Sequence, residues 1–213
     1  MAITQLSLYN GALRKIKERK LATLTDNTEP RRLLDDVWDG LITECLEMAL
    51  WRFARRTVKI EYDTDYTAAF GHTYRFVKPD DFVRTIGVWH DDRLNTPLLD
   101  YLDEGGYWYS DSPDLYVSYV SNATEYGSNF SLWPESFKEM FEYQLASGIV
   151  GRLSQSTTSQ EQVKSMLEEA TLTAKANSAM EGPSKMLPTS RWVAARLGRS
   201  RRGDLGNKGS LIG

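Results

Sequence analysis

The sequence contains a single cysteine, Cys45, and only two histidines, His72 and His90, among its 213 residues. One cysteine excludes an internal disulfide framework and an all-cysteine zinc site, and two histidines exclude most histidine-rich metal sites. Long apolar runs are missing as well, so we expect no membrane-spanning helix. The N-terminal residues show no basic stretch followed by a long apolar one, so we expect no secretory signal. These absences are typical of a soluble protein of a reducing cytoplasm.

The common catalytic motifs are also absent from the sequence. It has no Gly-x-Ser-x-Gly nucleophile motif, no phosphate-binding P-loop and no Gly-x-Gly-x-x-Gly motif after a strand. Cys45 lies on the apolar face of a predicted helix, which favours a buried structural thiol. His90, Asp91 and Asp92 are adjacent on a strand and therefore point to opposite faces, which disfavours a shared metal ion. We predict no metal site and no cofactor.

Two pairs of adjacent carboxylates are the remaining candidates for acid–base chemistry. Asp80 and Asp81 follow Pro79, and Asp103 and Glu104 precede two glycines. A glycosidase needs two carboxylates roughly 5 to 10 Å apart in a cleft. Both pairs lie in predicted turns, where acidic side chains are normally solvated, and we favour that interpretation. A carboxylate-based hydrolase of cell-wall sugar is the less favoured alternative.

The composition is that of a globular protein. The chain is 41% hydrophobic, 26% charged and 11% aromatic. Its tyrosines and tryptophans concentrate in residues 51–133, where their neighbours are mainly acidic residues and serines. A stacking platform for single-stranded nucleic acid would need exposed rings beside basic residues. The pattern therefore favours aromatic side chains of the core and of subunit interfaces.

Apolar residues recur every three or four positions in four segments, which predicts four helices. The segments are about 4–21, 30–50, 134–153 and 159–174, and Ser159 with Gln162 could form a capping box at the start of the last one. A short polar loop between the last two segments favours an antiparallel hairpin. The first two helices and the last two can then join into one bundle.

Between the helical pairs the apolar period changes from 3.6 to 2, which predicts an antiparallel sheet. The candidate strands are 58–62, 74–77, 86–88, 107–110 and 115–120, and Ser112-Pro113 suits a hairpin between the last two. The expected fold class is α+β: an antiparallel bundle of about four helices with an inserted antiparallel β-sheet subdomain and an extended C-terminal arm. The expected domain boundaries are 1–56 (helical), 57–131 (β insert), 132–182 (helical hairpin) and 183–213 (basic arm).

Charge of both signs is abundant but unevenly distributed. The chain has 26 Lys and Arg against 29 Asp and Glu, a formal charge of −3. Residues 183–213 hold seven basic residues against Asp204 alone and so have a charge of +6, which leaves −9 on residues 1–182. A terminal block of one sign is usually a solvated or partner-binding tail. With five glycines and two prolines, this arm cannot bury enough apolar surface to fold alone.

The basic arm has two possible classes of partner. Clustered guanidinium groups neutralise phosphates with little sequence demand, so a nucleic-acid-binding module acting through the arm is the main alternative. Phosphate contact needs no apolar residues, however, and residues 189–199 have an apolar stripe suited to a protein surface. We favour protein docking by seven residues of the arm: Arg191, Trp192, Arg196, Leu197, Arg199, Arg201 and Arg202.

Four stretches stand in a recognisable order: ALWRFA at 49–54, YRFVKPDDFVR at 74–84, LYVSYV at 115–120 and WPESF at 133–137. In order and spacing across about residues 5–180, the sequence resembles the tail tubular protein A family, the head-to-tail adaptors of short-tailed bacteriophages. The matching stretches are packing signatures rather than catalytic motifs. The arm after Pro183 lies outside the resemblance.

The resemblance implies a structural virion protein of the neck or tail, assembled in the bacterial host cytoplasm. Such adaptors form a ring, commonly of twelve copies, that binds beneath the portal, extends the DNA channel and provides the platform for the tail or nozzle. They have no enzymatic turnover and no cofactor. The expected partners are other copies of the chain, the portal and the tail or nozzle protein, with non-specific passage of genomic DNA and no membrane. An acidic body suits a channel that must not hold moving DNA.

Overall fold

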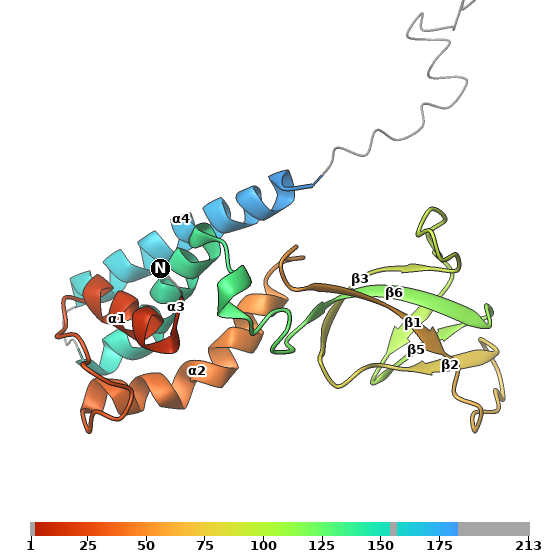
Figure 1. Ribbon diagram of the computed structural model, residues 1–213, viewed down its shortest axis with the longest axis horizontal. Helices are drawn as coiled ribbons and strands as arrows, with labels where there is room; N and C mark the ends of the chain where they lie inside the picture. The colour runs from red at the N-terminus through yellow and green to blue at the C-terminus, as the bar shows by residue number, and fades with distance from the viewer. Residues whose placement is uncertain (1–2, 154–156, 183–213) are drawn as a thin grey trace, which may run out of the picture. The chain divides into compact units, whose positions relative to one another are not determined.

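The computed structural model describes residues 3–153 and 157–182, and its fold class is α+β, as the sequence predicts (Figure 1). Four helices come in two pairs that flank the strands in the sequence. The first pair is α1 (Gln5–Lys15) and α2 (Glu29–Glu47). The second pair is α3 (Glu135–Leu153) and α4 (Thr157–Met180), and the short 3₁₀ helix η1 (Phe130–Leu132) precedes it.

Capping side chains and backbone conformation set the helix ends. Two of these ends differ from those that the sequence predicts. Thr4 and Ser7 form a capping box that starts α1. The helix ends at Lys15, earlier than expected, because Lys17 adopts a left-handed φ of 63°. The capping box predicted at Ser159 is wrong, because α4 starts at Thr157 and Ser159 lies within its first turn.

The two helical pairs share one hydrophobic core, as predicted. Apolar side chains of all four helices contribute to it, and α3 contacts α1, α2 and α4. Trp38 of α2 stands edge-on to Tyr9 of α1 and Phe141 of α3, with ring centroids 5.0 and 5.4 Å away. Such pairs stabilise a core beyond the area that they bury. Trp38 of α2 thus holds the first helical pair against the second.

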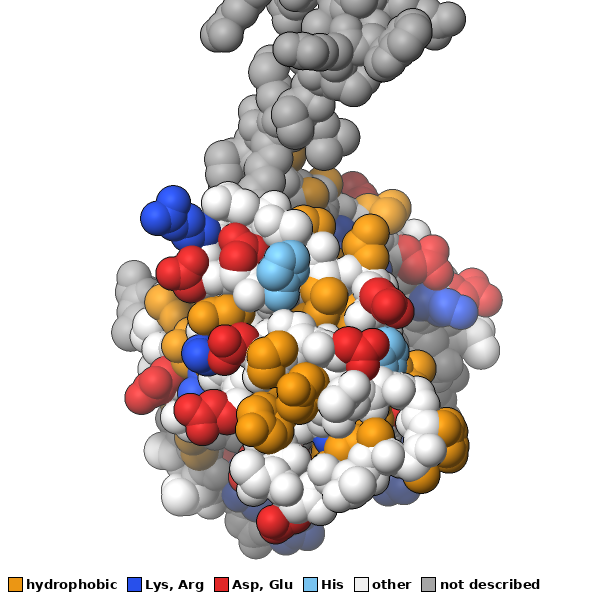
Figure 2. All heavy atoms as spheres, turned by 90° about the vertical axis from the view of Figure 1, so that its right-hand side faces the viewer, with side chains coloured by type: hydrophobic (Ala, Val, Ile, Leu, Met, Phe, Trp, Pro, Cys, Tyr) orange, Lys and Arg blue, Asp and Glu red, His pale blue; other side chains and the backbone are white. Residues whose placement is uncertain are grey.

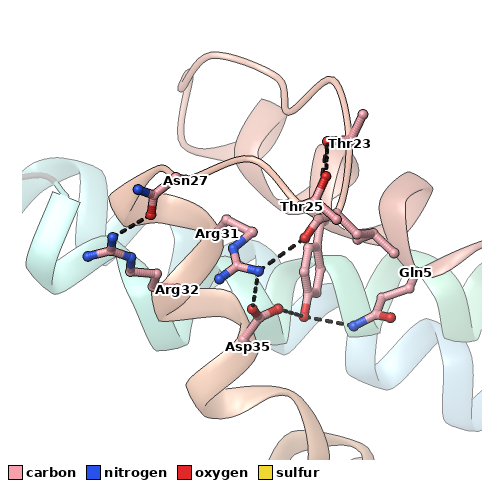
Figure 3. A network of polar contacts seen from close by, with 9 residues as sticks. Gln5, Thr23, Thr25, Asn27, Arg31, Arg32 and Asp35 are labelled. Atoms are coloured by element: carbon pink, nitrogen blue, oxygen red, sulfur yellow. Dashed lines mark hydrogen bonds and ion pairs between the residues drawn. The ribbon is translucent and has the colours of Figure 1, made fainter.

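A polar network connects α1, the loop that follows it and α2 (Figure 3). Asp35 of α2 accepts a hydrogen bond from the Tyr9 hydroxyl at 2.8 Å and pairs with Arg31 at 3.2 Å. Gln5 donates to the same hydroxyl at 2.9 Å, and Arg31 also donates to the Leu24 carbonyl of the loop at 3.1 Å. The network therefore fixes the loop and both helices relative to one another.

The strands form two three-stranded antiparallel sheets rather than one. The first has the order β1-β6-β3, and the second has the order β2-β5-β4. The strand bounds are β1 Arg55–Glu61, β2 Tyr74–Val77, β3 Phe82–Trp89, β4 Leu102–Glu104, β5 Tyr107–Ser110 and β6 Asp114–Ser121. The five predicted strands are present, and β4 was not predicted, because three residues are too short for a visible alternation.

The predicted hairpin between 107–110 and the next strand is wrong. β5 pairs with β2 and β4, whereas β6 lies between β1 and β3 of the other sheet. Residues 111–113 therefore carry the chain from one sheet to the other. Asp111 holds this crossing by accepting hydrogen bonds from the backbone N–H of Thr73 at 2.8 Å and from its hydroxyl at 3.0 Å.

The inner faces of the two sheets enclose a second, smaller core. Phe76 and Trp108 of the second sheet pack with Val88, Val117 and Tyr119 of the first. Other residues of the first sheet contact the helical core, among them the buried Val120 and the partly buried Ile86. The helices and strands of the described residues accordingly belong to one compact unit, which ends at Glu181. No helix in this part of the chain is long and apolar enough to cross a membrane.

Candidate functional site

The seven residues predicted to dock the arm all lie beyond residue 182, outside the described residues. The surfaces that the structure describes are those of residues 3–153 and 157–182. The other candidates from the sequence, the carboxylate pairs, the histidines, the cysteine and the aromatic residues, all fall within these ranges.

Asp81 is a structural carboxylate rather than a solvated turn residue. Its oxygens accept hydrogen bonds from Arg56 of β1 at 2.9 Å, from the Tyr119 hydroxyl of β6 at 3.0 Å and from the Ser121 hydroxyl. Burial would raise its pKa, but the hydrogen bonds from Ser121, Arg56 and Tyr119 outweigh it and hold the pKa below the usual range. Its neighbour Asp80 is exposed, as predicted.

Asp103 is engaged in the same way. It accepts hydrogen bonds from Lys78 at 2.5 Å, from the Thr85 hydroxyl at 2.7 Å and from the Trp108 indole N–H at 3.1 Å. Burial again opposes ionisation, but the Lys78 and Thr85 contacts keep the pKa of Asp103 below its usual range. Glu104 is exposed. A general acid needs a raised pKa, and neither engaged carboxyl has one.

The histidines and the cysteine show no reactive arrangement. His72 Nδ1 lies 3.3 Å from a carboxylate oxygen of Asp111, and His90 is exposed at the end of β3. Asp91 binds the backbone N–H groups of Asn95 and Thr96. Cys45 is buried, and burial raises the pKa of its thiol to about 12. Among the residues that the structure describes, no three His, Cys, Asp or Glu side chains are grouped to hold a metal ion.

Aromatic side chains divide into core residues and a surface set. Trp51, Trp108, Trp133 and Tyr119 are buried. The Trp51 indole donates to the Cys45 carbonyl at 2.7 Å, and the Trp133 indole donates to the Gly127 carbonyl at 2.8 Å. Two of the four signature stretches thereby meet in the helical core, because Trp51 and Trp133 both lie 4.8 Å from the Phe137 ring.

The surface set lies on the outer face of the second sheet. Tyr107 and Tyr109 of β5 flank the buried Trp108 and so point away from the core. Arg75 of β2 lies over the rings of Tyr107 and Tyr66, with its guanidinium carbon 4.5 and 4.7 Å from their centroids. We call these four side chains, with Val77 and Leu102 on the neighbouring strands, the tyrosine face.

The tyrosine face exposes apolar side chains on both edge strands of the second sheet and has acidic side chains at its edge. Val77 and Leu102 are 52% and 47% exposed, which is high for aliphatic residues of strands. A depression of about 280 Å³ beside Tyr109 and Leu102 is bordered by Phe70, itself 90% exposed, and by Glu104. A view from the side of the strands shows acidic side chains scattered among hydrophobic groups (Figure 2). Exposed apolar groups of this kind mark interaction surfaces.

The single guanidinium of this face is not available for phosphate. Asp63 binds Arg75 through two hydrogen bonds, at 2.5 Å from Nη2 and 3.2 Å from Nε, and this pairing raises the pKa of Arg75. A stacking platform for nucleic acid requires free positive charge beside the rings. The neutralised arginine, the tyrosines and the acidic edge fit a protein partner better.

Strand alternation predicts which strand residues share this face but not that the face is exposed. Tyr74 and Phe76 alternate with Arg75 and Val77, which assigns the second pair to the opposite side of the strand. The alternation does not tell which of the two sides is covered, so the surface emerges only from the structure. No protein-family model matches this chain, and a search of curated proteins finds no significant relative.

Proposed function

We propose that this chain is a structural virion protein, the subunit of a head-to-tail adaptor ring that binds beneath a portal. The ring extends the DNA channel and forms the platform for a tail or nozzle. The proposal makes the chain a binding protein without catalytic turnover or cofactor. The proposal is supported by the order of the four signature stretches in the sequence. In the fold, these stretches supply aromatic side chains of the core and the hydrogen bond from Tyr119 to Asp81.

The observation that carries the proposal is the tyrosine face. It is an uncovered, partly apolar sheet surface on a body in which two of the candidate carboxylates, Asp81 and Asp103, are occupied by structural hydrogen bonds. Tyrosine and arginine are enriched at protein interfaces, where rigid rings bury area with little loss of side-chain entropy. We assign this face to the tail or nozzle protein. The arm of residues 183–213 is then free to dock on the portal.

Deletion of residues 183–213 tests the portal side of the proposal. The unaltered chain is expected to co-sediment with purified portal rings, and the chain ending at Gly182 is expected to lose most of this binding. A second variant with Trp192→Ala and Leu197→Ala keeps every arginine and separates apolar docking from charge. If both variants bind the portal as well as the full chain does, the assigned role of the arm is wrong.

A nucleic-acid-binding module remains the second candidate because of the +6 charge of the arm. It predicts that full-length protein binds duplex DNA with an affinity that falls steeply with salt, whereas the truncated body does not bind. The adaptor proposal predicts that portal binding survives at salt concentrations that abolish DNA binding, since Trp192 and Leu197 contribute to it. Measuring both affinities across the same salt series distinguishes the two functions.

A further inference from the structure

The outer side of β1 carries backbone groups that have no partner among the described residues. In the ladder between β1 and β6, Ser121 N–H donates to the Ala54 carbonyl at 2.9 Å. Bonded and non-bonded pairs alternate along an antiparallel ladder, so the next bonded residues of β1 are the even-numbered ones. Thr57, Lys59 and Glu61 therefore direct their N–H and C=O groups away from β6, and no described residue forms a hydrogen bond with these groups. We call these outward backbone groups the β1 edge.

The other strands at the sheet edges are covered, irregular or short. β3 has two register shifts, and Leu98 N–H of the loop that follows it donates to the Val88 carbonyl at 2.8 Å. β2 is met by the chain that follows β1, since Asp63 N–H donates to the Arg75 carbonyl at 2.7 Å. β4 has three residues. β1 has seven residues in unbroken register with β6, so it offers a regular edge on which a further strand can pair.

The two faces of β1 give an added strand different neighbours. On one face Val58 and Ile60 are half-buried and pack against the smaller core between the sheets. On the other face Arg55 and Thr57 are exposed. The residues of an added strand alternate between the same two faces. Apolar side chains therefore fit beside Val58 and Ile60, where they would extend the cover of this core.

The unmatched charge of this edge lies at the start of the strand. Arg55 donates to the Ser118 hydroxyl at 3.1 Å, and neither Arg55 nor the exposed Arg52 forms an ion pair with any described residue. Burial and, to a smaller extent, the charge of Arg52 lower the pKa of Arg55. Lys59, by contrast, is already paired with Asp114 at 2.7 Å. An acidic side chain of an added strand would supply the counter-charge that Arg55 lacks.

A second copy of β1 does not have this chemistry. The strand carries Arg55, Arg56 and Lys59 against Glu61 alone. Pairing two such strands would bring like charges into neighbouring positions, which destabilises a sheet. Charged side chains on edge strands are one way in which proteins prevent pairing with their own copies. The charge of β1 thus favours a strand from a different protein.

We propose that the β1 edge binds an extended segment of a partner protein, which adds a fourth strand to the first sheet. The segment carries apolar residues on the side of Val58 and Ile60 and an acidic residue beside Arg55. Main-chain hydrogen bonds to the β1 edge hold the segment, and its alternating side chains set the specificity. This edge belongs to the first sheet, whereas the tyrosine face lies on the second. The inference therefore adds a third surface to the two that the proposed function uses.

A proline at position 59 tests the backbone hydrogen bonds. Lys59→Pro removes an N–H that points away from β6, so the ladder between β1 and β6 keeps its bonds. Lys59→Ala is the matched control, because both variants lose the ion pair with Asp114. The probe is a short fluorescent peptide of alternating glutamate and valine, and fluorescence anisotropy measures its affinity. Lys59→Ala should bind the peptide within about threefold of the unaltered chain, and Lys59→Pro should bind at least about tenfold more weakly.

A second peptide, with lysine in place of glutamate, tests the charge. The unaltered chain should prefer the glutamate peptide, and Arg55→Glu should reverse this preference. Lys164→Glu is the matched control, since Lys164 is exposed on α4 and forms no ion pair with any described residue. It should leave both affinities unchanged. Equal affinity of the unaltered chain for the two peptides would overturn the assignment of an acidic segment.

Amide hydrogen exchange followed by NMR tests the same edge without any variant, so the proposal stays falsifiable if Lys59→Pro does not fold. In the free chain the N–H groups of Thr57 and Lys59 should exchange much faster than that of Val58, which is directed toward β6. A saturating concentration of the glutamate peptide should slow exchange at Thr57 and Lys59 by at least about tenfold. The proposal is wrong if this peptide does not bind the unaltered chain, if it binds without protecting these two amides, or if Lys59→Pro binds as tightly as Lys59→Ala.

Discussion

Asp81 shows how a single side chain can connect three strands. Its carboxylate receives hydrogen bonds from β1 and β6, and its backbone carbonyl receives one from Asn122 N–H at 3.0 Å. The residue itself directly precedes β3. Arg56 is half-buried beside it and lies 5.6 Å from the Tyr126 ring. Removing the negative charge would therefore leave the Arg56 guanidinium on β1 without its matched charge.

Replacement of Asp81 by asparagine should destabilise the fold. The amide keeps the shape but loses the charge-assisted hydrogen bonds, and we expect a loss of about 2 to 3 kcal/mol in the free energy of unfolding. Asp80→Asn is the matched control, because that neighbour is exposed and its replacement should change stability by less than about 0.5 kcal/mol. Urea denaturation of both variants measures the difference. Equal stability of the two variants would contradict the structural role.

The same carboxylate also gives stability a dependence on pH. The folded-state pKa of Asp81 is lowered, so its contribution is complete above the unfolded-state pKa and disappears as the pH falls through the folded-state pKa. Asp81→Asn removes this contribution at every pH. The stability gap between the unaltered chain and the Asp81→Asn variant should thus be largest near neutral pH and shrink in acid.

At the scale of elements, the sequence indicates which segments are helices and strands better than it indicates their partners. Periods of 3.6 and 2 predicted the four helices and five of the six strands. Alternation assigns side chains to faces but does not choose between neighbours. β6 pairs with β1 and β3, which lie far from it in the sequence, so the division into two sheets depends on contacts that no local pattern contains. The engagement of Asp81 and Asp103 follows from those same distant contacts.

The packing of α1 against α3 depends on a glycine that the sequence pattern did not single out. A Cβ atom at Gly11 would lie 2.1 Å from the carboxyl carbon of Glu142 on α3, well inside contact distance. Glu142 is only 4% exposed, and burial raises the pKa of its carboxyl. The Glu142 carboxyl therefore fills the space beside Gly11, and the two helices approach closely at this point.

Gly11→Ala should accordingly destabilise the chain, by about 1 to 3 kcal/mol, because the buried Glu142 must move or the helices must separate. Gly40→Ala in α2 is the comparison, since a Cβ at Gly40 meets nothing within 4 Å. There the loss of backbone freedom in the unfolded chain should raise stability by about 0.5 to 1 kcal/mol. Thermal unfolding of the two variants should shift in opposite directions. A rise in the unfolding temperature on Gly11→Ala would show that α1 and α3 are not closely packed at Gly11.

At the scale of the whole molecule, the excess positive charge and the tyrosine face belong to different parts of the sequence. The tyrosine face lies on the described residues, while the excess positive charge of the sequence is concentrated beyond residue 182. The sequence predicted this charge division from composition alone. It could not locate the tyrosine face, because Tyr66 reaches Arg75 and Tyr109 only through the folding of the loop that precedes β2.

If the tyrosine face is the platform for the tail, a charge placed on it should weaken tail binding without unfolding the chain. Val77→Asp puts a carboxylate on an exposed strand position that already has acidic neighbours, and we expect the affinity for the nozzle protein of the same virion to fall by at least about tenfold. Leu172→Asp, at a 71% exposed position on α4, is the matched control and should bind as the unaltered chain does. Circular dichroism checks that both variants are folded, and biolayer interferometry measures the affinities.

Since the arm and the tyrosine face are assigned to different partners, Val77→Asp should still bind portal rings. Loss of portal binding together with tail binding would mean that the two surfaces do not act separately.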